Sequence, residues 1–191
     1  FSDDRVTLEI AGVALELVAA PGEPADQLYV WLPEERVVFA GDNFYQSWPN
    51  VYPLRGTARR SIRDWISSID SMVQEGPLHV VGGHTTPMLG NATEVLTNYR
   101  DAMRWVHDRT IEGAKQYMTP DELVEYAALP AHLADLDYLA DYYGSVWGTV
   151  RDIYAQDLGW FDGDPLNLHR ESPLRQSQRM AELVGGVGVL W

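Results

Sequence analysis

The sequence lacks cysteine altogether and is poor in basic residues. Without cysteine the chain forms no disulfide and offers no thiolate to a metal, and cysteine usage does not indicate its cellular compartment. No run approaches the roughly 18 apolar residues of a membrane-spanning helix, so we expect no membrane span. Only 14 Lys and Arg stand against 28 Asp and Glu, and the net charge of −14 argues against nucleic acid or an anionic membrane as a partner. The composition fits an enzyme that acts on small molecules.

The chain has the apolar content of a folded protein. Of its 191 residues 46% are hydrophobic, and the 7 Trp and 10 Tyr are ample for a packed core, so general disorder is excluded. The length allows one large domain or two small ones. Phe1 stands where a complete protein would begin with Met, and no signal peptide follows, so we expect the numbering to start inside a longer protein.

Residues 1–90 are predicted to be rich in β-structure. Five short segments are continuously apolar or alternate apolar and polar side chains, which predicts strands over residues 6–10, 13–18, 27–32, 36–40 and 78–81. Residues 59–73 carry apolar side chains at helical spacing, so we expect one helix there. Residues 43–56 contain aromatic residues and prolines without a period, so we expect a loop, and loops of this length are usually functional or mobile.

From residue 91 onward the pattern is helical almost throughout. Asn91 or Thr93 can cap a long helix that ends near Tyr117. The residues Thr-Pro-Asp-Glu at 119–122 form a capping box that opens a short helix. Further helices are predicted over residues 131–143, 145–157 and 172–184. We therefore expect an α+β chain, with one domain over residues 1–90 and a helical domain over residues 91–191.

Three turns place chemically active side chains near strand ends. Glu23, Asp42 and His84 each follow a glycine, which lets the backbone turn tightly. Two carboxylates and an imidazole on neighbouring strand ends can hold a divalent metal, and an Asp in such a place has one oxygen for each of two ions. Each residue alone also has an ordinary explanation: Glu23 as an exposed turn residue, Asp42 as a helix cap and His84 as a strand-end histidine. Their order and their glycines favour a metal site.

The order of these turns resembles the second half of the metallo-β-lactamase fold. Most hydrolases of that fold carry His after the Pro-Gly turn, whereas this chain carries Glu23, which resembles the zinc-dependent alkyl sulfatases. The resemblance implies the second half of an αββα sandwich followed by an all-α dimerisation domain. It extends over nearly the whole chain, through residues 21–25, 39–43, 50–56, 83–87, 99–101, 107–110, 123–130, 142–146 and 158–163.

One motif of that family is missing. The sequence contains no His-x-His-x-Asp-His stretch, so half of the two-metal site that the resemblance implies is absent from it. We therefore expect the chain to be a fragment of an alkyl sulfatase that is inactive by itself.

The resemblance also implies roles for individual residues. Glu23, Asp42 and His84 are expected to be metal ligands, in an intact enzyme with two zinc ions per subunit and a bound water or hydroxide as the nucleophile. Asn50 and Arg55 are expected to bind the sulfate of an alkyl sulfate substrate similar to SDS, and the planar fork of Arg suits an anion with several oxygens. The helical domain implies a homodimer.

Other side chains keep two explanations. Arg55 could instead pair with a carboxylate. For Arg59, Arg60 and Arg63 we favour a solvated helix face over a role at the site. The aromatic side chains of the loop could either line a channel for the alkyl tail or pack in the core; they are Phe44, Tyr45, Trp48 and Tyr52.

The sequence departs from the family at one further place. After Gly144-Ser145-Val146 some alkyl sulfatases carry a His that assists the leaving group, whereas this chain has Trp147-Gly148. If the leaving oxygen needs a proton, another group must supply it.

Three functions remain open from the sequence. The first is a zinc-dependent alkyl sulfatase, which hydrolyses the ester to an alcohol and sulfate. The second is a non-catalytic fragment whose role is dimerisation. The third is another hydrolase of the metallo-β-lactamase fold, such as a thioesterase or lactonase, and Glu23 together with the sulfatase-like helical half argues against it.

Overall fold

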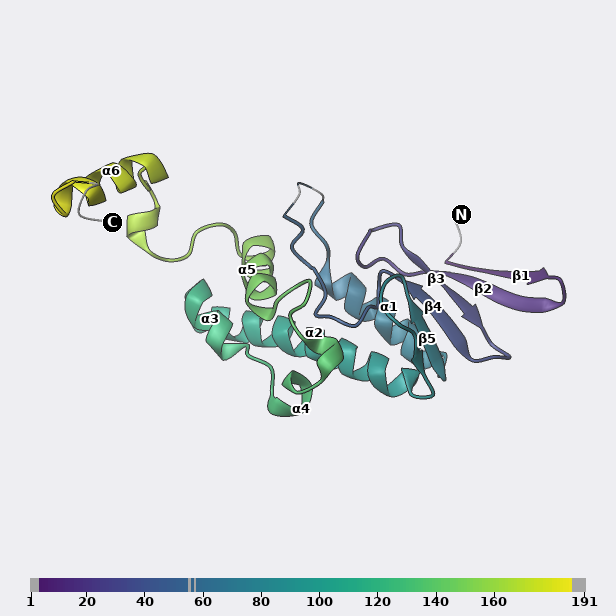
Figure 1. Ribbon diagram of the computed structural model, residues 1–191. Helices are drawn as coiled ribbons and strands as arrows, with labels where there is room; N and C mark the ends of the chain where they lie inside the picture. The colour runs from purple at the N-terminus through teal and green to yellow at the C-terminus, as the bar shows by residue number, and fades with distance from the viewer. Residues whose placement is uncertain (1–3, 55, 57, 187–191) are drawn as a thin grey trace. The chain divides into compact units, whose positions relative to one another are not determined.

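The computed structural model describes residues 4–54, 56 and 58–186. The chain divides into two compact units, one up to Gly159 and one from Trp160 onward. The first unit combines a six-stranded sheet with helices (Figure 1), so the predicted α+β class is confirmed. In the described part of the chain no helix combines the length and apolar character that crossing a membrane requires. The predicted domain boundary at residue 90 stays a prediction.

The strands pair in the order in which they occur along the chain. All neighbours are antiparallel except β4 and β5, which are parallel because helix α1 lies between them in the sequence. The strands are β1 (Arg5–Ile10), β2 (Val13–Ala19), β3 (Leu28–Leu32), β4 (Val37–Gly41), β5 (His79–Gly82) and β6 (Met88–Leu89). The five predicted strands are therefore present, and the two-residue β6 was not predicted because it is too short to show a period.

The first hairpin illustrates why these strands form. Ala11 and Gly12 both have positive φ angles, 53° and 83°, which matches the two-residue turn that right-twisted antiparallel strands prefer. The flanking residues Ile10 and Val13 are direct partners in the ladder. The turn chemistry and the alternation of side chains thus specify the same register.

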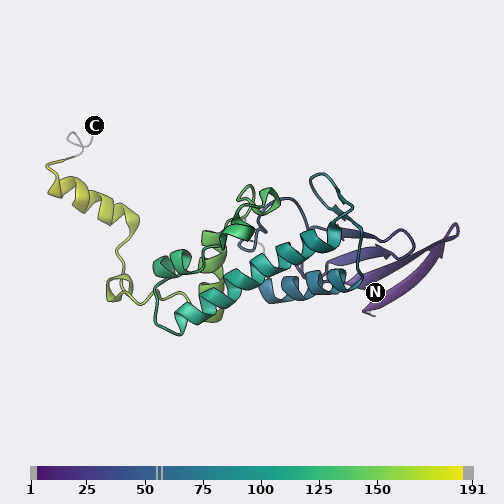
Figure 2. The same ribbon diagram turned by 90° about the horizontal axis from the view of Figure 1, so that it is seen from below.

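One face of the sheet is buried and the other is open. Tyr29, Trp31 and Val38 belong to the buried face, which packs against helices α1 (Ile62–Gln74) and α2 (Ala92–Ala114). The two helices lie side by side along the sheet (Figures 1 and 2). The opposite face is also apolar but uncovered; it includes Val6, Leu8, Ile10, Leu15, Leu17, Val30 and Phe39, none of which is buried.

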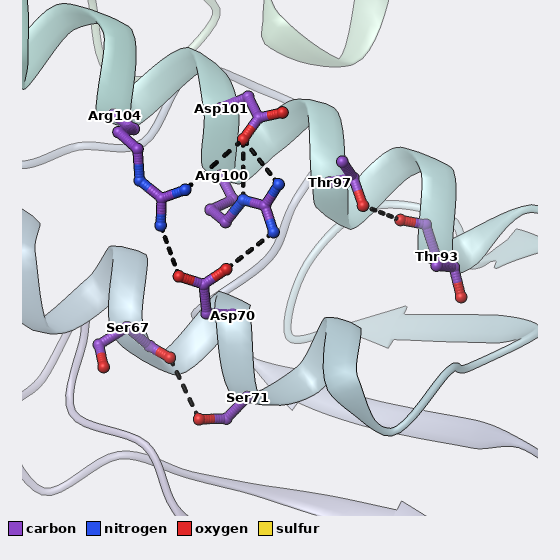
Figure 3. A network of polar contacts seen from close by, with 8 residues as sticks. All are labelled: Ser67, Asp70, Ser71, Thr93, Thr97, Arg100, Asp101 and Arg104. Atoms are coloured by element: carbon purple, nitrogen blue, oxygen red, sulfur yellow. Dashed lines mark hydrogen bonds and ion pairs between the residues drawn. The ribbon is translucent and has the colours of Figure 1, made fainter.

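Polar contacts join helices α1 and α2. Asp70 of α1 accepts hydrogen bonds from Arg100 and Arg104 of α2, at 2.8 Å from Arg100 (Figure 3). Asp101 lies on the same helix as both arginines and pairs with them there. A carboxylate shared by two guanidinium groups fixes the rotation of α1 against α2.

The remaining helices follow the predicted pattern with one exception. They are α3 (Pro120–Tyr126), α4 (Ala131–Ala134), α5 (Val146–Asp157) and α6 (Pro173–Leu183), with short 3-10 turns at Asp137–Leu139 and Pro165–Asn167. The capping box of α3 is present, because the Thr119 side chain accepts from the Glu122 N–H and the Glu122 side chain accepts from the Thr119 N–H. At α2 the first cap position is Asn91, whose side chain makes no capping bond.

The continuous helix predicted over residues 131–143 is wrong. Helix α4 ends at Ala134, and Leu136 and Ala140 adopt extended backbone. The carbonyl of Ala140 accepts a hydrogen bond from the backbone N–H of Trp48 at 2.9 Å, and the Tyr143 N–H donates to the Ser47 hydroxyl at 2.8 Å. Tertiary pairing with the loop after β4 therefore overrides the helical pattern of this segment.

Candidate functional site

The sheet topology brings three predicted ligands to one edge. Strands β2, β4 and β5 run in the same direction, so their carboxyl ends lie at the same edge of the sheet. Glu23 follows β2, Asp42 follows β4 and His84 follows β5. Because β4 and β5 are neighbours, His84 Nε2 lies 3.4 Å from Asp42 Oδ1. All three side chains line one cavity of about 660 Å³.

These side chains share a cavity but do not by themselves enclose an ion. Among the residues that the structure describes, no three Asp, Glu or His side chains lie close enough together to hold a metal. His84 and Asp42 are accessible, with 73% and 40% of their side chains exposed, whereas Glu23 is 9% exposed. The cavity wall is completed by polar and aromatic side chains, namely Tyr45, Gln46, Ser47, Thr85, Tyr142 and Tyr143.

Glu23 has an unusual environment for a carboxylate. Its Oε1 accepts an ion pair from Arg60 at 2.8 Å, while its Oε2 is buried and makes no hydrogen bond within the described residues. Burial raises the pKa of the Glu23 carboxyl above its ordinary value, and the Arg60 guanidinium and the Tyr45 hydroxyl oppose this shift. A buried carboxylate oxygen without a hydrogen bond is costly unless a cation completes it, so Glu23 suits a metal ligand, although the described residues hold no complete set of ligands.

Asn43 connects the turn that carries Glu23 to the turn that carries Asp42. The Asn43 side chain donates to the carbonyl of Ala20 at 2.7 Å and accepts from the backbone N–H of Glu23 at 3.1 Å. The backbone carbonyl of Asn43 accepts a hydrogen bond from the indole N–H of Trp65 at 2.9 Å. Asn43 is completely buried, so each of these bonds replaces one to water. The role of Asn43 was not predicted, although an Asn beside a predicted ligand at a strand end was a usable signal.

Two of the glycines beside the predicted ligands are required because other atoms approach them closely, and their φ angles are not positive. A Cβ on Gly22 would lie 2.0 Å from Asn43 Oδ1, and a Cβ on Gly83 would lie 2.1 Å from Asp42 Oδ1. Gly41 differs, since its φ of 56° lies in the left-handed region. The backbone bends at Gly22 and Gly83 as well, but a positive φ angle requires glycine only at Gly41.

Asn50 lies on a neighbouring cavity of about 670 Å³. Its backbone N–H donates to the Tyr45 hydroxyl at 2.9 Å. Tyr143 lines both this cavity and the one with Glu23, so the two adjoin. The other lining residues are Tyr52, Leu54, Trp147, Gly148, Arg151, Asp152 and Ala155. Arg55, the second predicted sulfate-binding residue, lies outside the described residues.

The aromatic residues of the loop divide between core and cavity. Phe44 and Trp48 are completely buried, and both belong to the hydrophobic core, so neither lines a channel. Tyr45 and Tyr52 lie on the walls of the two cavities. Trp147, which is 54% exposed, forms part of the wall beside Tyr52 and was not predicted to do so.

Arg60 corrects the expectation of a solvated basic helix face. Arg59 is exposed, and Arg63 pairs at the surface with Asp157. Arg60 is only 9% exposed, because its side chain turns inward to Glu23 just before Ser61 caps helix α1. The sequence could not separate it from its neighbours, since the three arginines stand in one polar stretch.

Comparison with known proteins agrees with this geometry. Residues 119–191 match the family described as alkyl sulfatase dimerisation. A linear primary-alkylsulfatase of Pseudomonas sp. is 37% identical over 187 residues, which cover 96% of this chain and 35% of that protein. The alkyl/aryl-sulfatase BDS1 of Saccharomyces cerevisiae is 28% identical over 183 residues, 93% of this chain and 28% of that protein. The chain thus spans about a third of the length of these relatives.

Solved structures lead to the same family. The stereoselective inverting sec-alkylsulfatase Pisa1 from Pseudomonas sp. superposes with a TM-score of 0.90 at 25% identity, over all of this chain and 31% of that one. A metallo-beta-lactamase family protein from Thermus thermophilus has a TM-score of 0.52 at 19% identity, over 82% of this chain and 48% of that one, and shows the fold alone. The resemblance predicted from the sequence is confirmed: the chain is similar over nearly its whole length to a part of the alkylsulfatases, and residues 119–191 match the alkyl sulfatase dimerisation family.

Proposed function

We propose that the protein containing this chain is a zinc-dependent alkyl sulfatase that hydrolyses SDS-like esters to an alcohol and sulfate. The single observation that carries the proposal is the position of Glu23, Asp42 and His84 on one cavity, in a chain that is similar to alkylsulfatases over nearly its whole length. The fold that the chain shares with a metallo-beta-lactamase family protein agrees with this proposal.

Glu23, Asp42 and His84 are the proposed ligands of two zinc ions per subunit. Carboxylate oxygens and imidazole nitrogens are ordinary zinc donors, and the unpaired Oε2 of Glu23 supports a cation in the cavity. Further ligands would have to come from residues other than these three, because the described residues hold no complete set. When bound, zinc would supply Lewis-acid activation of water near neutral pH.

The two adjoining cavities suit the two ends of an alkyl sulfate. Asn50 and Arg55 are proposed to bind the anionic head, and Asn50 is held beside the metal cavity through Tyr45. The apolar tail is proposed to lie along Tyr52, Leu54 and Trp147, which line the second cavity. Tyr143, shared by both cavities, would lie at the junction between head and tail.

The uncovered apolar face of the sheet supports the fragment interpretation. Val6, Leu17, Val30 and Phe39 form a continuous row across four strands. In a sandwich of two sheets this face packs against the second sheet, as the predicted αββα arrangement requires. We propose that residues beyond those described cover it in the whole protein.

A homodimer is proposed from the match to the dimerisation family. None of residues 160–186 is buried, although α6 presents Leu174, Met180 and Leu183. Apolar side chains left without cover on a small unit favour association with a second copy. Light scattering on the purified protein should give the mass of a dimer, and replacing these three residues by Ser should shift it to that of a monomer.

The catalytic proposal is tested in the longest natural protein that contains this chain. Zinc per subunit is measured by atomic absorption, and hydrolysis is measured on dodecyl sulfate and on a thioester. We expect about two zinc ions, turnover of the sulfate ester, and loss of both in Glu23→Gln, Asp42→Asn and His84→Ala. Glu34→Gln and His132→Ala change exposed residues of the same types and serve as controls. Preferential hydrolysis of the thioester would instead favour another hydrolase of this fold, and no turnover at all would favour a dimerisation fragment.

A further inference from the structure

Arg60 contacts two parts of the candidate site at once. One guanidinium nitrogen lies 2.8 Å from Glu23 Oε1, and the other terminal nitrogen donates to the backbone carbonyl of Asn50. Arg60 and Glu23 are each 9% exposed, so their contact is shielded from water. This places a single side chain between a proposed metal ligand and the loop that is proposed to bind sulfate.

The ion pair between Arg60 and Glu23 determines which carboxylate oxygen of Glu23 is available to a metal. Because Arg60 occupies Oε1, the carboxylate is oriented with Oε2 free of hydrogen bonds among the described residues. The backbone N–H of Glu23 is separately held by Asn43, so the position of the residue does not depend on Arg60 alone. Arg60, together with the Tyr45 hydroxyl, therefore acts on the orientation of the carboxylate, whereas Asn43 holds the backbone.

The contact with Asn50 fixes the loop from the other side. The Asn50 carbonyl accepts from Arg60, and the Asn50 N–H donates to the Tyr45 hydroxyl. Both partners lie beside Glu23, since Tyr45 lines the same cavity. The backbone of Asn50 is thus tied through side chains to the surroundings of a metal ligand.

Arg60 itself is anchored at the start of α1. Its carbonyl accepts from the Gln156 side chain of α5 at 3.3 Å, and the next residue, Ser61, caps α1 through the N–H of Asp64. Because the backbone of Arg60 is fixed and the donors of its guanidinium lie in one rigid plane, the side chain can hold its two acceptors in a defined relative position. A lysine at position 60 would keep the positive charge, but its single ammonium group could not hold Glu23 and the Asn50 carbonyl in a fixed relative geometry.

We propose that Arg60 is a positioning residue that orients Glu23 toward the metal and sets the sulfate-binding loop at Asn50 relative to it. This inference rests on the proposed function. Loss of a residue that orients a metal ligand typically lowers metal affinity by roughly 10–100-fold. The alternative is that Arg60 only neutralises a buried carboxylate, in which case any cation would serve.

The experiment compares Arg60→Met, Arg60→Lys and Arg59→Met in the longest natural protein that contains this chain. Zinc affinity is measured by competition with a chelator, and amide hydrogen exchange at residues 50–52 is measured in the metal-free protein. We expect Arg60→Met to lower zinc affinity by about 10–100-fold and to accelerate exchange at Asn50. Arg60→Lys should retain most of the zinc affinity yet accelerate the same exchange and raise KM for dodecyl sulfate. Arg59→Met should change neither quantity.

Unchanged exchange at residues 50–52 in both Arg60 variants would overturn the proposal, as would unchanged zinc affinity in Arg60→Met. If Arg60→Met does not fold, the double variant Glu23→Gln/Arg60→Met removes both buried charges, and its exchange at Asn50 should still be fast. If the unmodified protein takes up no zinc and hydrolyses no sulfate ester, the proposed function fails. The exchange measurement then still decides whether Arg60 holds the loop.

Discussion

The indole N–H of Trp48 donates a hydrogen bond to the Thr149 hydroxyl at 2.9 Å, and both residues are completely buried. Trp48 belongs to the loop that follows β4, whereas Thr149 lies on α5, within the region that matches the dimerisation family. Residues about a hundred positions apart therefore share one core. Helix α5, which lies in the region that matches the alkyl sulfatase dimerisation family, therefore supports the loop that carries Asn50.

Replacing Thr149 by Val should destabilise the protein by about 1–3 kcal/mol, because the buried Trp48 N–H loses its acceptor while the shape is kept. Urea unfolding measures the free energy directly. Thr149→Ser keeps the hydroxyl and should cost less than Thr149→Val. Equal losses in the two variants would show that the hydrogen bond contributes little beyond packing.

Replacing Gly83 by Ala should weaken metal binding in the intact enzyme. The added Cβ would lie 2.1 Å from Asp42 Oδ1 and 3.0 Å from the carbonyl carbon of Gly41, so the carboxylate must move. We expect at least a tenfold loss of zinc affinity (about 1.4 kcal/mol), measured by chelator competition. Circular dichroism of the variant checks that the fold is retained. If Gly83→Ala binds zinc as tightly as the natural protein, the assignment of Asp42 as a ligand would be contradicted.

Replacing Asp70 by Asn should loosen the contact between α1 and α2. The substitution removes the shared partner of Arg100 and Arg104 (Figure 3), and we expect a loss of about 1 kcal/mol in urea unfolding. Asp101→Asn is the matched control, because Asp101 pairs with arginines of its own helix. The difference between the two variants should shrink in 1 M salt, since salt screens partly exposed ion pairs.

The capping box of α3 should make stability depend on acid pH. Hydrogen bonds from the Thr119 N–H and hydroxyl lower the pKa of Glu122 below 4.5 in the folded state. The stabilisation is therefore present above pH 4.5 and is lost as the pH falls through the lower folded value. The stability advantage of the natural protein over Glu122→Gln should decrease below pH 4.5 in urea unfolding. Glu125→Gln, the same change outside the box, is the control.

The wall of the second cavity should discriminate between substrates by tail length. Trp147→Ala removes a large apolar surface beside Tyr52. In the intact enzyme we expect kcat/KM for dodecyl sulfate to fall by about tenfold, the effect of roughly 1.4 kcal/mol of lost apolar contact. A short-chain sulfate should lose less. Trp160→Ala, which changes an exposed Trp of the second unit, is the control. Equal losses for long and short esters would place the tail elsewhere.

Local signals were sufficient for most elements. The alternation of residues 6–18 predicted the first hairpin, and the capping box predicted the start of α3, because both depend on neighbours close in the sequence. The segment over residues 131–143 shows the limit. Its pattern is helical, yet pairing of Ala140 with Trp48 takes it out of the helix. Competition from a distant partner has no trace in a local window.

The sequence by itself determined the resemblance to alkyl sulfatases, the α+β class and the three residues that line one cavity, because a strand end, a glycine and a predicted ligand are neighbours along the chain. Only the tertiary structure decided the environment of those residues: that Arg60 turns inward to Glu23, that Asn43 ties two turns together, and that Phe44 and Trp48 are core residues. The physical reason is that a side chain's direction and its desolvation depend on the elements packed around it, which lie far away in the sequence.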